Sequence, residues 1–462
     1  MKRTALFAAG LLAASASADV LPFVEALQPE PPPAPAPVVP AVPDVLTLDQ
    51  ALVFALENNF AIRQARERLR EQEGLIVEVR AQAIPNVAAT VGYSRDARSL
   101  SEARAGVPVN YQNWRAAIIV RQLVYSGGGV SAALDAAKTT RAAAVFEIEA
   151  VVNEVLLLVR TRFADVLLNR ERIQVQEQGV ALLKEQLLTA KNRFEAGSVS
   201  HFEVLTAEVA LANAQPALIS ARNGLRIAID ELRAALGYQG GFGSDLKKVP
   251  AFTGTLEYHP VAYELQASLS AAKARRPELL RLEQIRRARE SGVTVSKADY
   301  LPEIYVTGGY EGVKRSTSNS LNDSLDGWTA GVEASWALFD GARTRGKVVQ
   351  ARAQLNQARL SVAEQTLAVE VEVRRALSSL QEAAELAEAA AKVVGQAEEA
   401  LRLADVRYRN GAATQLDVLQ ARQALTEASL NRLEANYRHT IALATVRKAV
   451  GESDPVTASA MP

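Results

Sequence analysis

The stretch RFEAG at residues 193–197 returns 214 positions later as RYRNG at residues 407–411. The same spacing separates the pair LG at 236–237 from VG at 450–451, and AIP at 83–85 is followed 217 positions later by YLP at 300–302. A unit of this length, used twice with almost no drift, indicates a tandem duplication of a whole fold and not a short solenoid repeat. Each copy has the same order of parts: a helix, a strand pair, a very long helix, a tight turn and a second long helix.

One very long helix is predicted before the tight turn of each repeat. Neither glycine nor proline occurs between Val130 and Gln178 or between Lys347 and Val394, and the helical pattern continues to Gly197 and Gly411. A helix over residues 130–196 would be about 100 Å long, so it must pack on a similar helix. Near the turns, apolar residues step by 4, 3 and 4, which is typical of coiled coils: Leu183, Leu187, Ala190 and Phe194, and again Ala397, Leu401, Ala404 and Tyr408. Each half therefore ends in a long antiparallel helical hairpin. Its turn glycine lies at the C-terminal end of the first helix, where the backbone adopts a left-handed conformation.

Short alternating stretches predict strands. Ile304 and Val306 alternate with polar neighbours, and residues 87–93 of the first half are in the matching phase. In the returning strand, Val332 and Trp336 share one face, whereas Glu333 lies on the other. We expect Ile304, Val306, Val332 and Trp336 to face lipid and Glu333 to face a lumen. The phase of the segment at 111–125 is left open by its apolar run AAIIV.

Four strands are too few to close a barrel, since the smallest barrels have about eight. Open sheet edges are not tolerated in lipid, because nothing there satisfies their backbone polar groups. Closure must therefore come from other copies of the chain.

The chain divides into six predicted regions. Residues 1–18 have the basic start, apolar stretch and small-residue cleavage site of a signal peptide, and residues 19–45 form a proline-rich tether. The other regions are listed in order: first repeat 46–237, connection 238–258, second repeat 259–451, and a tail at 452–462 that looks disordered. The chain has no cysteine, and 52 basic residues balance 52 acidic ones. This composition excludes a disulfide framework and gives no basic surface for nucleic acid.

Together these features resemble the TolC-type outer-membrane efflux proteins. The resemblance is carried by LTLDQAL at 46–52 with ALENN at 55–59, by the strand entries at Pro85 and Pro302, by LFDG at 338–341, and by the turn segments 193–207 and 407–421. It implies a mainly helical fold with a transmembrane β part: a homotrimer with a twelve-stranded β-barrel, four strands per chain, continued by an α-helical coiled-coil barrel in the periplasm. It also implies docking on an adaptor protein and an inner-membrane pump.

The resemblance further implies two sets of functional residues. Asp417 matches the carboxylate ring that narrows the periplasmic mouth, and Glu203 matches the carboxylate that ties a tyrosine, here Tyr408, in the closed entrance. Gln420 stands where the family often has a second aspartate, and Ala413 where it often has a basic residue. The turn segments Ala196-Gly197-Ser198 and Asn410-Gly411-Ala412 match the segments that meet the adaptor.

Other motifs give no chemistry of their own. The segment 341–347 nearly spells a phosphate-binding loop, but Val348 follows the lysine where a hydroxyl is needed. The three histidines are scattered, so we predict neither catalytic residues nor a metal or cofactor. The sequence predicts a passive outer-membrane exit duct for efflux or type I secretion, with a periplasmic coiled-coil adaptor or structural protein as the alternative. The transported substrate, the pump and the adaptor are left open.

Overall fold

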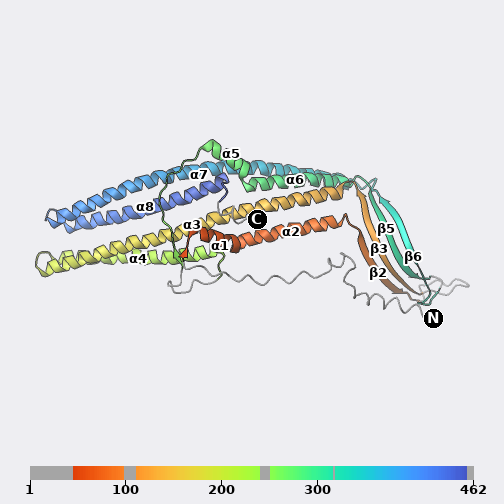
Figure 1. Cartoon of the computed structure of the whole chain (residues 1–462), viewed down its shortest axis with the longest axis horizontal. Coiled ribbons are helices and arrows are strands. Elements are labelled where there is room, and N and C mark those ends of the chain that lie inside the picture. The colour runs from red at the N-terminus through yellow and green to blue at the C-terminus, as the bar shows by residue number, and fades with distance from the viewer. Residues whose placement is uncertain (1–44, 98–110, 240–249, 316–317, 455–462) are drawn as a thin grey trace. The chain divides into compact units, whose positions relative to one another are not determined.

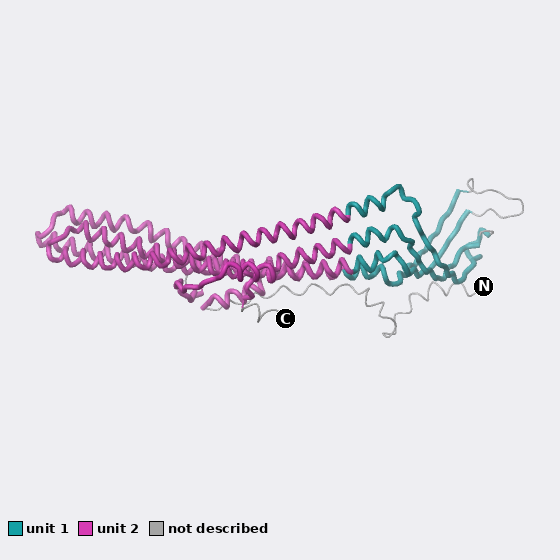
Figure 2. The backbone as a smooth tube through the Cα atoms, turned by 90° about the horizontal axis from the view of Figure 1, so that it is seen from above, with its two compact units in different colours: residues 1–38, 76–134, 292–350 teal, residues 39–75, 135–291, 351–462 magenta. Residues whose placement is uncertain are grey.

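The computed structural model describes residues 45–97, 111–239, 250–315 and 318–454. The predicted signal peptide and almost all of the predicted tether lie outside the described residues. The chain divides into two compact units, shown in different colours in Figure 2. One contains the described parts of 76–134 and 292–350; the other contains those of 39–75, 135–291 and 351–462.

The helices confirm the tandem duplication, because each helix of the first repeat has a partner of equal length in the second (Figure 1). The pairs are α1 (Leu48–Asn58) with α5 (Leu265–Arg275), α2 (Phe60–Ala81) with α6 (Pro277–Ala298), α3 (Gly129–Glu195) with α7 (Arg343–Arg409), and α4 (His201–Leu236) with α8 (Gln415–Val450). The two longest have 67 residues each, as the long runs without glycine or proline predict. No helix in the described ranges combines the length and apolar character needed to cross a membrane.

The four longer strands form an antiparallel sheet in the order β2-β3-β5-β6 (Figure 1). Their bounds are β2 (Asn86–Arg95), β3 (Gln112–Ser126), β5 (Glu303–Lys314) and β6 (Ser324–Ser335). The central pair, β3 with β5, joins the two repeats in a single sheet. Strands β2 and β6 lie at the edges, and among the described residues each has a neighbour on one side only.

The register of the sheet gives every strand a phase, because directly opposed residues share a face. Val306 lies opposite Val332, and Tyr305 lies opposite Glu333, as the alternation predicts. Val120 lies opposite Gly308, which settles the phase of β3 that the sequence leaves open. One difference concerns Trp336, which lies just after the end of β6, where its indole Nε1 donates to the Tyr300 carbonyl at 3.0 Å.

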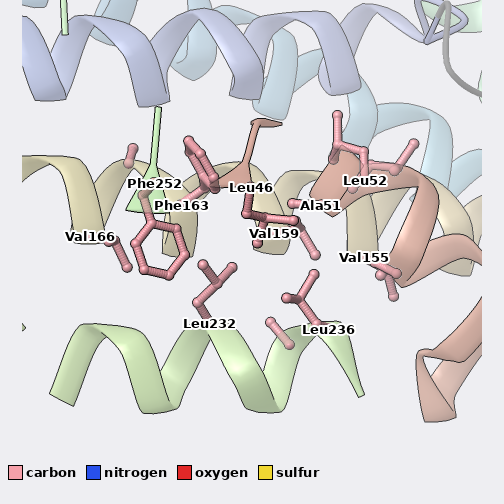
Figure 3. Close-up of a cluster of buried hydrophobic side chains, with 14 of the residues drawn as sticks. Leu46, Ala51, Leu52, Val155, Val159, Phe163, Val166, Leu232, Leu236 and Phe252 are labelled. Carbon is pink, nitrogen blue, oxygen red and sulfur yellow. The ribbon is translucent and has the colours of Figure 1, made fainter. Parts of the chain in front are cut away.

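A hydrophobic core lies between α1, α3 and α4 in the second unit (Figure 3). It is covered by a short parallel pair, β1 (Val45–Leu46) with β4 (Ala251–Phe252), which the sequence analysis did not predict. Leu46, Val159 and Leu232 are fully buried there. Strand β1 lies at the boundary of the predicted tether and first repeat, and β4 lies in the predicted connection, so the connection takes part in this core.

The first residues of the predicted tail are also held in place. The Glu452 amide donates to the Arg447 carbonyl at 3.0 Å, and the Asp454 carboxylate pairs with Arg160 on α3. The expectation of a disordered tail therefore does not hold for residues 452–454. The remaining tail residues lie outside the described part of the chain.

The long return helices end at Gly237 and Gly451, which are equivalent in the two repeats. Gly237 has φ 74°, and a Cβ there would lie 2.5 Å from the Asn58 carbonyl oxygen. Gly411 has the same φ of 74°, but nothing lies within 4 Å of a Cβ added at that turn. Both positions need glycine for the backbone, and Gly237 needs it for space as well.

We therefore expect Gly237→Ala to destabilise the protein more than Gly411→Ala. The left-handed conformation alone costs about 1–2 kcal/mol with a Cβ, and the overlap at Gly237 adds about 1–3 kcal/mol. Urea unfolding of the detergent-solubilised protein, followed by circular dichroism, measures both variants. Equal midpoint shifts for the two variants would contradict the close packing at Gly237.

Candidate functional site

The two hairpin turns have nearly the same backbone geometry. Gly197 and Gly411 have φ 71° and 74°. The Ser198 amide donates to the Arg193 carbonyl at 2.9 Å, and the Ala412 amide donates to the Arg407 carbonyl at 2.8 Å. These bonds satisfy the last carbonyls of each long helix, as in a Schellman motif. All six predicted docking residues are exposed at these turns: Ala196, Gly197, Ser198, Asn410, Gly411 and Ala412.

The Asp417 carboxylate takes part in a helix cap at the start of α8. Its Oδ2 accepts from the Thr414 amide at 2.7 Å and from the Thr414 hydroxyl at 2.8 Å. The Asp417 amide donates back to Thr414 Oγ1, which completes a capping box. These hydrogen bonds lower the pKa of Asp417 below its usual range. The residue stays exposed and ionised, so its charge remains available outside the cap.

The sequence analysis missed this cap, although the pattern Thr414-x-x-Asp417 is the signal that reveals it. The equivalent residue Glu203 occupies the same position in α4, but its N-cap Ser200 makes no side-chain bond. The Glu203 side chain is half-buried. The two equivalent carboxylates therefore differ in their hydrogen bonds, because only Asp417 takes part in a capping box with the N-cap residue of its helix.

Tyr408 has a neighbour that the sequence analysis did not name. The Arg193 guanidinium carbon lies 5.1 Å from the centre of the Tyr408 ring, which brings the ends of α3 and α7 together. Within the described part of one chain, no hydrogen bond joins Glu203 to Tyr408. Gln420 is exposed on α8, one turn beyond Asp417.

The apolar face of the sheet is exposed in the single chain. Val91 is 86% exposed, Trp328 79% and Val332 73%. These residues share one face with Ile304 and Val306 by the register. An exposed apolar surface of this extent marks a site of contact with another protein or with a membrane.

Residues that suggested other chemistry are engaged in structural contacts. The Lys347 ammonium lies 2.5 Å from Asp299 Oδ2, so this lysine of the loop-like segment is held in an ion pair. His439 is buried against the ring of Tyr258, and burial together with the nearby His259 lowers the pKa of His439. The described residues contain no group of three side chains suited to a metal ion.

A family model described as outer membrane efflux protein matches residues 51–238 and 268–452, one match on each repeat. The chain belongs to this family. It is an export channel of the bacterial outer membrane with a periplasmic extension, and the family consists of channel proteins, which are not enzymes.

Curated relatives and solved structures agree with this membership. The efflux protein is 25% identical to the cobalt-zinc-cadmium resistance protein CzcC of Cupriavidus metallidurans, over 88% of this chain and 90% of that protein. It is 25% identical to the protein CyaE of Bordetella pertussis, over 87% and 82% of the two chains. The CmeC outer membrane channel of Campylobacter jejuni has the same fold, with a TM-score of 0.75 at 17% identity, over 89% of this chain and 88% of that chain.

Proposed function

We propose that three copies of the chain assemble into a passive exit duct, which receives its substrate from a periplasmic adaptor and an inner-membrane pump. The observation that carries this proposal is the sheet order, because β2 and β6 are edge strands of a four-stranded sheet. An edge strand in lipid needs a partner, and β6 of one copy can pair with β2 of the next. Three copies supply twelve strands, enough for a barrel with an aqueous interior.

The surface of α4 supports the same assembly. Phe202, Leu205 and Val209 recur at heptad spacing and are exposed in the single chain, Phe202 at 75%. Apolar residues at this spacing are typical of a second helix–helix contact. The core side of the hairpin uses different residues, Val204 and Ala207. A neighbouring copy is therefore the partner that we assign to this stripe.

The duct needs no chemistry of its own. In the trimer, three Asp417 carboxylates would surround the axis near the hairpin turns. The negative charges of such a ring attract cations and repel anions when salt does not screen them. The Thr414 bonds hold each carboxylate in one direction, so the ring is formed before any ion arrives.

The closed entrance would be held between neighbouring hairpins. In the trimer, the Tyr408 hydroxyl would donate to a Glu203 carboxylate, a charge-assisted bond that contributes about 1.5–3 kcal/mol. Gln420 replaces a second carboxylate and Ala413 a basic residue, so fewer charges close this entrance. An adaptor that binds the two exposed turns would open the duct by straightening the hairpins.

The substrate is set by the pump in this arrangement. The relatives carry names as different as cobalt-zinc-cadmium resistance protein and alkaline protease secretion protein. A passive duct accommodates such different cargo, because the energy and the selection come from its partners. We therefore assign no single substrate class to the lumen.

The oligomeric state tests the duct directly. We expect the detergent-solubilised protein to have the mass of three chains and to fractionate with the outer membrane. Light scattering coupled to size-exclusion chromatography measures the mass. A stable monomer, or recovery of the folded protein only in the soluble periplasm, would overturn the proposed duct.

We expect Asp417→Asn to reduce cation selectivity and block by divalent cations. Asparagine removes the charge but keeps an oxygen that accepts the Thr414 bonds, so the helix cap is retained. Single-channel currents in planar bilayers, with and without a divalent cation on the turn side, provide the measurement. Glu399→Gln is the control, because Glu399 already pairs with Arg402 on α7. Unchanged selectivity and block in Asp417→Asn would leave Asp417 as a capping residue only.

A further inference from the structure

One arginine on the polar face of the sheet connects three strands. The Arg121 guanidinium carbon on β3 lies 3.9 Å from the centre of the Tyr305 ring on β5. Its Nη2 lies 3.6 Å from Glu333 Oε2 on β6. The Tyr305 hydroxyl donates to Glu303 Oε2 at 3.1 Å. Arg121 is therefore held by a stacked ring and a carboxylate, an arrangement that suits a planar guanidinium better than an ammonium.

The same residues border a cavity of about 690 Å³ at the junction of the sheet with the helices of its own unit. Arg121, Glu303 and Tyr305 line it from the sheet. Glu78 lines it from α2, and Asp299 lines it from the residue that follows α6. Lys347 pairs with Asp299. Glu333 lies beside Arg121. Negative charge is therefore in excess among these residues, which comprise four carboxylates and two cations: Glu78, Asp299, Glu303 and Glu333 with Arg121 and Lys347.

These charges are in contact with water. The side chains of Arg121 and Glu333 are 51% and 63% exposed, so their pairing adds little to stability. The energetic value of this pair is therefore small, although its geometry is well defined. A partly exposed charge that is held in place acts mainly through its field on passing ions.

We propose that Arg121 is a second selectivity-determining residue of the duct, separate from the carboxylates of Asp417. This inference depends on the proposed trimeric duct, in which the polar face of the sheet points to the lumen. Three Arg121 residues then lie at one level of the barrel and offset the carboxylates around them. Their number and permanent charge limit how strongly this level favours cations.

Removal of Arg121 should change the cation-to-anion permeability ratio in a defined direction. Arg121→Gln leaves Glu333 without its cation and increases the negative charge at this level of the sheet, so cations are favoured more strongly. Three charges within about 10 Å of the ion path, screened over a Debye length of about 10 Å at 0.1 M salt, change the cation-to-anion permeability ratio about twofold. The change should nearly vanish at 1 M salt, where the Debye length is about 3 Å.

Reversal potentials in asymmetric KCl, measured on the full-length protein in planar bilayers, test the proposal. We expect Arg121→Gln to raise the permeability ratio and Glu333→Gln to lower it. The double variant should return to the wild-type ratio, because it removes both charges of the pair. Arg121→Lys should keep the wild-type ratio, because it keeps the charge and loses only the stacking.

A matched control comes from the other face of the sheet. Arg95 on β2 has the phase of the apolar face, so Arg95→Gln removes the same charge away from the proposed lumen and should leave the ratio unchanged. An unchanged ratio in Arg121→Gln, or shifts of the same sign in Arg121→Gln and Glu333→Gln, would overturn the inference while the duct stands. A wild-type protein that forms no conducting channel would instead overturn the proposed duct and this inference with it.

Discussion

Lysine in place of Ala330 should prevent most of the protein from assembling in the outer membrane. Ala330 lies in the middle of β6, opposite Gly308, on the exposed apolar face that also carries Trp328 and Val332. A lysine that faces lipid near the midplane of the bilayer costs about 2–4 kcal/mol. The trimer carries this cost three times, about 6–12 kcal/mol in all, which is comparable to the whole stability of a folded protein.

The adjacent residue provides the control. Thr329 lies opposite Gly309, at the same depth as Ala330 but on the polar face. Thr329→Lys should therefore assemble nearly as well as the wild type. The measurement is the amount of trimer in isolated outer membranes, detected by electrophoresis without heating. If both lysines are tolerated, or both are rejected, the apolar face does not contact lipid in the way that we propose.

The sequence predicts the phase of β2, β5 and β6 but not of β3, and the structure shows why. In β5 and β6 the polar and apolar residues alternate cleanly. In β3, Ile118 and Ile119 are both apolar and point to opposite faces. Ile119 lies opposite Gly309. A Cβ added at Gly309 would lie only 2.5 Å from the Ile118 carbonyl oxygen. An isoleucine on the polar face is accommodated against a glycine of the next strand, and a periodicity argument within one strand cannot reveal this.

Similar limits apply to the candidate gate. The repeat spacing identifies Glu203 and Asp417 as equivalent residues, and the turn glycines are predicted from local helix-end chemistry. The contact of Arg193 with Tyr408 escapes a reading of the sequence, because the two residues are far apart along the chain and meet only when two hairpins fold together. Local chemistry is therefore readable from the sequence, whereas contacts between the repeats are not.

The pairing of β1 with β4 is the largest feature that the sequence did not predict, and Phe163 provides its test. The Phe163 ring on α3 packs edge-to-face on Phe252 of β4, with ring centres 6.0 Å apart (Figure 3). Phe163 is 2% exposed. Truncation of a buried phenylalanine to alanine costs about 3–5 kcal/mol, because the surrounding core closes the cavity only in part. We expect Phe163→Ala to lower the urea midpoint of the solubilised protein by the corresponding amount.

Phe202→Ala is the control for Phe163→Ala, since it removes the same side chain from an exposed position on α4. Phe202 is 75% exposed in the single chain and lies on the stripe that we assign to a neighbouring copy, so its loss should weaken the association of copies and leave the core of each chain intact. Phe163→Leu should recover most of the lost stability, because leucine refills much of the cavity. A small effect of Phe163→Ala would mean that β4 does not close the core. The predicted connection at 238–258 would then be a linker, as the sequence alone suggests, and not a part of the folded body.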